Sequence, residues 1–194
     1  DREGTLETLK KDYLLGGIKV IDAASFIAGP SAATIMSDYG AEVIKIEPQN
    51  GDSLRNLISN GRMPEGPENY CWELTSRNKK SVSLNLKDEK AHNILIDLIK
   101  EADVFITNMP FPIRKKLKIT SDDIRPHNAK LIYASLTGYG EVGPDADRTA
   151  YDSVAWWARS GLMDFVRPSN NAPVAWSTPG MGDHPTVMAL YGAI

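Results

Sequence analysis

Short apolar runs alternate with helical segments along residues 18–138, and this alternation constrains the fold more than any other feature of the sequence. The clearest unit is IKVIDA at 18–23, the turn-like SFIAGP, a helical segment at 31–38 that ends before Gly40, and AEVIKIE at 41–47. A strand, a glycine-containing loop, a helix and a second strand within about thirty residues form a βαβ unit with parallel strands. The sequence therefore predicts a parallel α/β structure.

The alternation continues beyond this unit. Residues 88–101 carry acidic side chains in the first turn and an apolar face at helical spacing, made up of Ala91, Ile94, Leu95, Leu98 and Ile99. Further strands are expected at 81–87, 104–107 and 131–138, and further helices at 113–117, 121–124, 153–163 and 187–194. We expect a Rossmann-like parallel sheet with helices on both faces, and a long surface excursion at 48–78.

Composition excludes several classes of partner. The net charge is −3 and the Lys and Arg residues are scattered, so no basic stripe is present for a nucleic acid. No apolar run is long enough to span a membrane, and residues 1–17 lack the order of a signal peptide. Cys71 is the only cysteine, which suits a reducing compartment and a packed thiol. We therefore expect a cytoplasmic protein that binds neither nucleic acid nor membrane.

Several familiar kinds of site lack their motifs. The histidines, His92, His127 and His184, show no metal-ligand spacing, so no metal is expected. No G-x-S-x-G elbow is present for a serine hydrolase. The loop after the first strand occupies the place of a dinucleotide-binding turn, but it lacks G-x-G-x-x-G and Pro30 removes an N–H donor. A nicotinamide cofactor is therefore not expected either.

Glycine-bearing or turn-like loops follow the predicted strands, where open α/β sheets bind their ligands. They are Ala28-Gly29, Asn108-Met109-Pro110, Gly138-Tyr139-Gly140 and Gly180 to Asp183. Together they favour a nucleotide-like ligand beside a reactive carboxylate, without naming a reaction.

Asp183 has two interpretations from the residues alone. Asp183 or His184 is a suitable helix N-cap, because Pro185 fits the first turn and an apolar run follows. Alternatively, Gly180 and Gly182 let a ligand approach a carboxylate held at the positive end of a helix. Both interpretations remain open at this point.

Seven segments, in this order, resemble the class III CoA-transferases, the family of formyl-CoA transferase and carnitine CoA-transferase. They are GIKVIDAASFIAGP, YGAEVIKIEPQNGD, NKKSVSLNLK, EADVFITN, LIYASLTGYGEVGP, AYDSVAWWARSG and GMGDH. They cover nearly the whole chain after about Gly16. The resemblance is closest to members that move CoA among 2-hydroxy acids and their enoate products.

The resemblance implies that residues 17–194 are the CoA-binding large domain of a two-domain subunit, with residues 1–16 as an extension and the small domain absent. Such subunits interlock as homodimers. It also implies that Asp183 is a nucleophile that attacks an acyl-CoA thioester, so that CoA passes to a small carboxylic acid through aspartyl intermediates. Coenzyme A then enters as the acyl-CoA substrate, and no metal or nicotinamide takes part.

The resemblance also places CoA contacts, although some positions depart from the family pattern. The implied contacts are Ile27, Ala28, Leu84, Asn85, Leu86, Lys87, Asn108, Met109, Pro110, Lys116 and Tyr151. Pro48 stands where formyl-CoA transferase has an arginine, and Lys116 replaces another arginine, which keeps the charge but loses the planar fork.

Three alternatives remain. An acyl-CoA racemase or isomerase of the same family needs a histidine where this chain has Tyr151, and a phenol is a poor base at neutral pH. A non-catalytic CoA- or nucleotide-binding module is the second alternative, and a nicotinamide oxidoreductase is the third. Four apolar residues are candidates to line an acyl pocket for an aryl or branched acid, with core packing as the competing role: Trp156, Trp157, Met163 and Phe165.

Overall fold

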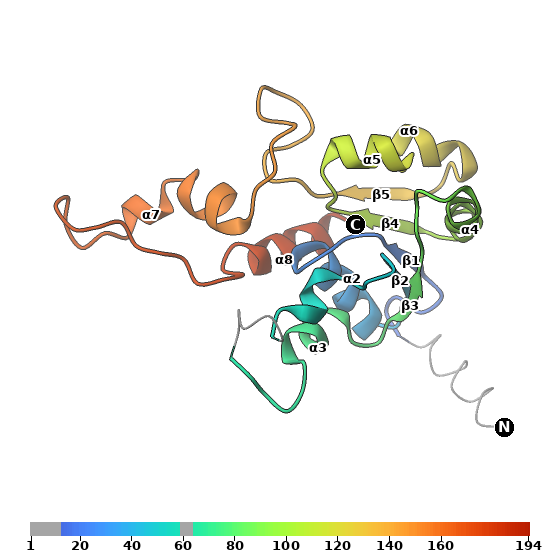
Figure 1. Ribbon diagram of the computed structural model, residues 1–194, viewed down its shortest axis with the longest axis horizontal. Helices are drawn as coiled ribbons and strands as arrows, with labels where there is room; N and C mark the ends of the chain where they lie inside the picture. Colours follow the sequence, from blue (N-terminus) through green and yellow to red (C-terminus); the bar gives the residue numbers. More distant parts are fainter. Residues whose placement is uncertain (1–12, 59–63) are drawn as a thin grey trace.

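A computed structural model of the protein describes residues 13–58 and 64–194 (Figure 1). Its centre is a five-stranded parallel sheet in the order β3-β2-β1-β4-β5. The strands are β1 (Lys19–Asp22), β2 (Glu42–Glu47), β3 (Lys80–Ser83), β4 (Val104–Thr107) and β5 (Ile132–Ser135). The predicted parallel α/β fold is therefore confirmed.

The strand order changes direction beside β1. The chain proceeds from β1 outward to β2 and β3, and then places β4 and β5 on the other side of β1. In an open α/β sheet, such a switch point leaves a crevice beyond the carboxyl ends of the two strands that flank it. The loops that follow β1 and β4 are therefore the places to look for a ligand.

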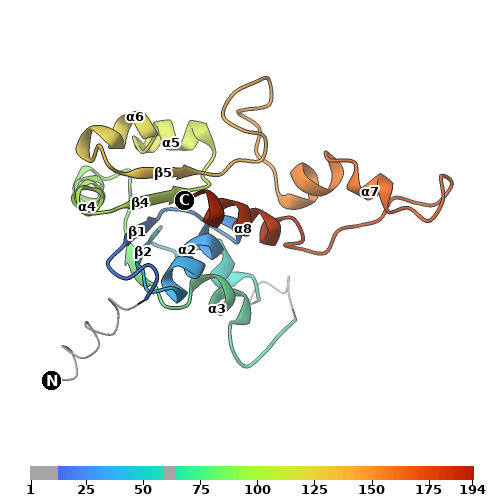
Figure 2. The ribbon, with the colours of Figure 1, turned by 180° about the vertical axis from the view of Figure 1, so that it is seen from behind.

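Helices cover both faces of this sheet, as predicted. The longer elements are α2 (Ala28–Asp38), α3 (Tyr70–Ser76), α4 (Glu89–Lys100), α5 (Phe111–Leu117) and α8 (Asp183–Ala193). The short turns are η1 (Ser53–Asn56), α6 (Ser121–Ile124), η2 (Arg125–His127), the π-helical η3 (Ser153–Ala158) and α7 (Leu162–Phe165). Figures 1 and 2 show α4, α5 and α6 on one side of the sheet and α2 and α8 on the other.

Alternate strand residues supply the two layers of the core, because successive side chains of a strand point to opposite faces. Ile21 and Phe105 belong to the layer beneath α4, α5 and α6. Val20 and Val104 belong to the layer beneath α2 and α8. On that second side the small side chains of α2 allow a close approach to Val187 of α8.

The amphipathic helix expected at 88–101 is confirmed as α4, with Asp88 as an N-cap that accepts hydrogen bonds from two backbone N–H groups. Its buried side chains are Leu95, Ile96 and Ile99. The predicted apolar face was wrong at Ile94, which is 48% exposed. Ile94 lines a groove between α4 and the strands β1 and β2.

Three predicted boundaries differ from the structure. The helix expected from Ser31 begins at Ala28. Its first turn tolerates Pro30, because the backbone N–H groups of a first turn have no partner within the helix. β3 and β5 end at Ser83 and Ser135, earlier than expected, and the residues after them form loops. The helix expected at 153–163 is broken at Gly161, whose φ of 83° is left-handed.

The segment from η3 to the start of α8 extends away from the sheet (orange in Figures 1 and 2). Large apolar side chains are exposed along it, with Trp176 97% and Phe165 85% accessible. The excursion expected at 48–78 carries η1 and α3, and its residues 59–63 lie outside the described residues. Most of the extension predicted at 1–16 lies outside them too. No helix among the described residues is long and apolar enough to cross a membrane.

Candidate active site

A cavity of about 800 Å³ lies beyond the carboxyl ends of β1, β4 and β5, at the switch point of the sheet. The amino-terminal end of α8 and the segment around η3 close its other side. Its lining residues are 25–28, 53, 108–110, 136–138, 149–152, 154–156, 182, 183 and 186. A cavity of this size is typical of sites for small molecules.

Asn108 joins the two loops at the switch point. Its side-chain oxygen accepts a hydrogen bond from the backbone N–H of Ser25 at 2.8 Å, and its amide nitrogen donates to the Ser25 carbonyl at 2.7 Å. The loop after β1 is therefore fastened to the loop after β4, although the two residues are 83 positions apart.

Arg114, on α5, connects the loop after β4 to the loop after β5. Its guanidinium is fully buried and donates to the Met109 carbonyl at 2.6 Å, to the Ser135 hydroxyl at 2.6 Å and to the Glu141 carboxylate at 2.5 Å. Nothing in the sequence pattern distinguishes this residue as functional. Arg114 is followed by two lysines in FPIRKKL, and no signal distinguishes the buried cation from the exposed ones.

Asp183 is the first residue of α8 and lines the cavity. The prediction that Asp183 or His184 is the N-cap is wrong, because Gly182 occupies the N-cap position and no side chain caps the helix. Within the described residues the Asp183 carboxylate accepts no hydrogen bond. It is half-buried and available to whatever enters the cavity.

Burial and a second acid raise the pKa of Asp183 to about 6. Burial is the larger cause, the charge of Asp152 acts in the same direction, and His184 opposes both. Asp152 is held nearby because one of its carboxylate oxygens accepts from the Gly182 N–H at 3.1 Å and the other from the Ser153 N–H at 2.8 Å. A carboxylate with this pKa is mostly ionised at neutral pH and still easily protonated in mild acid.

The two glycines before Asp183 serve different purposes. Gly180 has a φ of 80°, which non-glycine residues rarely adopt. A side chain at Gly182 would place its Cβ 2.7 Å from the Cβ of Trp156, closer than real atoms pack. Trp156 therefore fills the space that a side chain at Gly182 would take, while Gly182 itself lines the cavity.

Seven of the predicted site residues line the cavity: Ile27, Ala28, Asn108, Met109, Pro110, Tyr151 and Asp183. The other five lie elsewhere, at Leu84, Asn85, Leu86, Lys87 and Lys116. Leu84 is buried in the core, and Lys116 is exposed on α5. Of the four candidates for an acyl pocket, only Trp156 lines the cavity. Trp157 is buried, and its indole N–H donates to the Ala175 carbonyl at 2.8 Å.

Phe26 and Asp152 also line the cavity, although no role had been assigned to either. The Phe26 ring lies 5.9 Å from the Tyr151 ring, which closes the space between the first loop and the segment before η3. Asp152 belongs to the AYDS motif, but no local signal indicates that it meets Gly182, thirty positions later.

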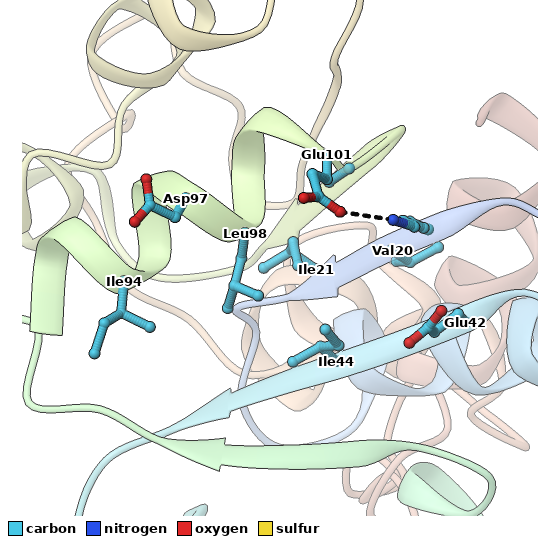
Figure 3. Close-up of a pocket in the computed structure, with 10 residues that line it drawn as sticks. Val20, Ile21, Glu42, Ile44, Ile94, Asp97, Leu98 and Glu101 are labelled. Atoms are coloured by element: carbon cyan, nitrogen blue, oxygen red, sulfur yellow. Dashed lines mark hydrogen bonds and ion pairs between the residues drawn. The ribbon is translucent and has the colours of Figure 1, made fainter.

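A second, smaller cavity of about 320 Å³ lies between α4 and the strands β1 and β2, where it includes Lys19 and Glu42, the first residues of those strands. In Figure 3, Ile94 and Leu98 of α4 face Ile44, and a dashed line marks the ion pair between Glu101 and Lys19. The groove has an apolar floor and a charged rim, and its lining includes no histidine, serine or cysteine. Within 13–58 and 64–194, no three His, Cys, Asp or Glu residues are grouped as a metal site would need.

Comparison with known proteins identifies relatives over nearly the whole chain. The family described as CoA-transferase family III matches residues 15–194. An (R)-2-hydroxy-4-methylpentanoate CoA-transferase of Clostridioides difficile is 40% identical over 91% of this chain and 44% of its own length. A cinnamoyl-CoA:phenyllactate CoA-transferase of Clostridium sporogenes is 40% identical over 91% of this chain and 43% of its own.

The crystal structure of Rv3272 from Mycobacterium tuberculosis, in its orthorhombic form, superposes with a TM-score of 0.83 at 32% identity, over 93% of this chain and 49% of that one. The chain thus spans less than half the length of the relatives that it matches.

Proposed function

This chain belongs to CoA-transferase family III, and we propose that the full-length protein moves CoA from an acyl-CoA donor to a free carboxylic acid. The observation that supports this most directly is the Asp183 carboxylate, which lines the cavity at the switch point and accepts no hydrogen bond within the described residues. A carboxylate nucleophile divides one difficult acyl transfer into easier steps. The named relatives act on 2-hydroxy acids or their enoyl derivatives, and we propose the same class here.

In the proposed first step, a carboxylate oxygen of Asp183 bonds to the thioester carbonyl carbon and the carbon–sulfur bond breaks. CoA leaves as the thiolate, and a mixed anhydride remains on Asp183. The thiolate then attacks the aspartyl carbonyl, which releases the donor acid and gives an aspartyl-CoA thioester. The acceptor carboxylate repeats the two steps in reverse, so the acceptor leaves as its CoA thioester and Asp183 is regenerated.

The surroundings of Asp183 suit this chemistry. The positive end of α8 favours the ionised nucleophile and the negative charge that develops on the carbonyl oxygen. With a pKa of about 6, Asp183 is mostly ionised at pH 7, which is the form that a carboxylate nucleophile needs. Tyr151 lines the same cavity, and its phenol gives no support to the racemase alternative.

The apolar part of the lining suits a branched or aromatic acyl group. Phe26, Ile27 and Met109 contribute from the loops after β1 and β4, and Trp156 contributes from η3. Aromatic and aliphatic side chains of this kind are typical of the part of a pocket that buries an apolar group of a substrate. We therefore propose a 2-hydroxy acid with a branched or aryl side chain as the acid exchanged.

The remaining expectations are also proposals for the full-length protein. We propose that residues 17–194 form the CoA-binding large domain, and that the protein is an interlocked homodimer. The exposed Trp176 and Phe165 on the projecting segment support the dimer, because large apolar side chains are seldom left in water. A cytoplasmic location and the CoA contacts at Leu84–Lys87 and Lys116 stay predictions.

The test is to trap the covalent intermediate. The full-length protein is incubated with branched, aryl and short acyl-CoA donors, quenched with hydroxylamine, and the mass of the peptide that contains Asp183 is measured. We expect a hydroxamate on Asp183 that is absent from Asp183→Asn and present in the matched control Asp97→Asn, an exposed acid on α4. An unmodified Asp183 in a protein that binds CoA would contradict the proposed nucleophile.

A further inference from the structure

Side chains hold the backbone of Ala24, Ser25 and Phe26, between β1 and α2, at five points. Asn108 accounts for two of these, as described above. The Ala24 N–H donates to Asp22 at 3.1 Å, and the Ala24 carbonyl accepts from the Lys45 ammonium at 2.9 Å. The Phe26 N–H lies 3.3 Å from both carboxylate oxygens of Asp52.

The conformation that these contacts hold is an unfavourable one. Phe26 has a φ of 70°, in the left-handed region that residues with a Cβ avoid. Backbone strain of this kind persists only where the surroundings impose it, and it concentrates at functional sites. The Asp52 carboxylate, which binds the N–H of the strained residue itself, is therefore placed where it opposes relaxation of the loop.

Three of the groups that hold the loop, Asp22, Lys45 and Asp52, form a buried cluster of four charges together with Lys79. The Lys45 ammonium lies 3.1 Å from Asp52 and 3.6 Å from Asp22, and the Lys79 ammonium lies 2.9 Å from Asp22. All four side chains are at most 2% exposed. Two cations and two anions balance, so the cluster carries no uncompensated charge.

The electrostatics keep Lys45 and Asp22 ionised. Burial alone would lower the pKa of Lys45, but the charges of Asp22 and Asp52 raise it above its usual value. Burial alone would raise the pKa of Asp22, but Lys79 and Lys45 bring it below its usual value. A buried ion pair seldom stabilises a fold better than apolar packing does, whereas this cluster fixes the backbone of Ala24 and Phe26 in a defined geometry.

The loop that the cluster holds is a wall of the cavity. Residues 25–28 all line it, and the Phe26 ring packs on Tyr151. Tyr151 precedes Asp152, whose carboxylate holds the Gly182 N–H next to Asp183. A change in the loop would therefore alter both the cavity wall and the packing beside the nucleophile segment.

We infer that Lys45 and Asp52 are positioning residues, which hold the Phe26 loop in its strained conformation so that acyl-CoA meets a preformed wall. This inference rests on the proposed function for its substrate. Neither side chain lines the cavity, so both act through the backbone of Ala24 and Phe26. Preorganisation of this kind lowers the cost of ordering the site when the substrate binds.

The test removes the anchors without leaving a buried charge unpaired. In the full-length protein, Lys45→Met/Asp52→Leu removes one charge of each sign and the acceptor of the Phe26 N–H, and it leaves Asp22 paired with Lys79. The control, Asp97→Leu/Lys100→Met, makes the same changes in an exposed pair on α4 whose charged atoms are 2.8 Å apart. Hydrogen exchange at Ser25 and Phe26 and the steady-state constants are measured in each. Lys45→Met/Asp52→Asn, which is also charge-balanced and removes only the Lys45 anchor on the Ala24 carbonyl, is the second variant if the first does not fold.

We expect exchange at Phe26 to rise about tenfold or more, and the KM for acyl-CoA to rise about tenfold with kcat within about threefold, in the cluster variant only. Partial unfolding would instead lower kcat at an unchanged KM, because it only reduces the amount of active protein. Unchanged exchange and an unchanged KM in a folded variant would overturn the inference. So would rapid exchange at Ser25 and Phe26 in the unsubstituted protein. Lack of turnover by the unsubstituted protein would count against the proposed function, and the exchange data would still decide whether the anchors hold the loop.

Discussion

The backbone N–H of Gly182 donates to the carboxylate of Asp152 at 3.1 Å, and this one hydrogen bond sets a second acid beside Asp183. Its effect is twofold. It fixes the residue that precedes α8, and it brings in a negative charge that opposes ionisation of Asp183. The first effect needs only an acceptor oxygen, whereas the second needs a charge, so the two are separable by substitution.

Replacing Asp152 by asparagine is expected to lower the pKa of Asp183 from about 6, because the charge is lost while an acceptor oxygen for Gly182 remains. Activity that needs ionised Asp183 falls as the pH drops through this pKa. The acidic limb of a kcat/KM profile between pH 4 and 8 should therefore move to lower pH in Asp152→Asn. Asp147→Asn, an exposed acid in the preceding loop, serves as the control. An unmoved limb would show that the charge of Asp152 does not reach Asp183.

The raised pKa of Asp183 also predicts a pH-dependent cost in stability. The folded protein favours the protonated acid. The stabilising contribution of Asp183 to the free energy of unfolding is therefore fully present below its pKa in the unfolded chain, about 3.9, and is lost as the pH rises through its folded pKa of about 6. Asparagine cannot ionise, so Asp183→Asn should be more stable than the unsubstituted protein at pH 7 and about equally stable at pH 4. Urea unfolding at the two pH values measures this. An equal effect of the substitution at both would contradict it.

Gly182→Ala is expected to destabilise the fold. Its new Cβ would lie 2.7 Å from the Cβ of Trp156, so either η3 or the start of α8 must move. Overpacking of this kind costs about 1 to 3 kcal/mol in the free energy of unfolding, and the displacement of Asp183 should also reduce activity. Gly192→Ala, further along α8 with no atom near its new Cβ, should instead be neutral or stabilise by up to about 1 kcal/mol. Equal unfolding free energies for the two variants would disprove the steric argument.

Arg114→Met is expected to loosen both loops that Arg114 joins. The substitution removes the donors to the Met109 carbonyl, to Ser135 and to Glu141. Buried acceptors left unpaired cost about 1 to 3 kcal/mol each, less where water reaches them, as it does at Glu141. The free energy of unfolding of Arg114→Lys should lie between those of Arg114→Met and the unsubstituted protein, since a lysine keeps the charge without the planar fork. Urea unfolding compares both with Lys115→Met, an exposed position on the same helix, which we expect to change the free energy of unfolding little.

Local patterns accounted for the elements of the fold. The apolar run at 18–23, the acidic first turn of α4 and the Gly and Pro residues between the strands depend on neighbours within a few positions, and such signals survive in a single sequence. The seven matching motifs then indicated the family, and the family match over residues 15–194 confirms it. Predictions from local patterns were wrong where contacts between distant elements decide which side chains are covered. Ile94 fits the apolar face of α4 but is exposed, because no element among residues 13–58 and 64–194 covers that part of the groove.

The sequence by itself determined the parallel α/β fold, the family and the choice of Asp183 as the candidate nucleophile, whose role stays a prediction. Only the tertiary structure decided what surrounds that carboxylate. Asp152 and Gly182 are 30 positions apart, and Asn108 and Ser25 are 83 apart. The buried cluster that holds the Phe26 loop also draws on separate elements, with Lys45 in β2 and Asp52 beyond it. Contacts of this kind produce no periodic pattern in the sequence, because they arise only when the strand order brings distant loops to the same edge of the sheet.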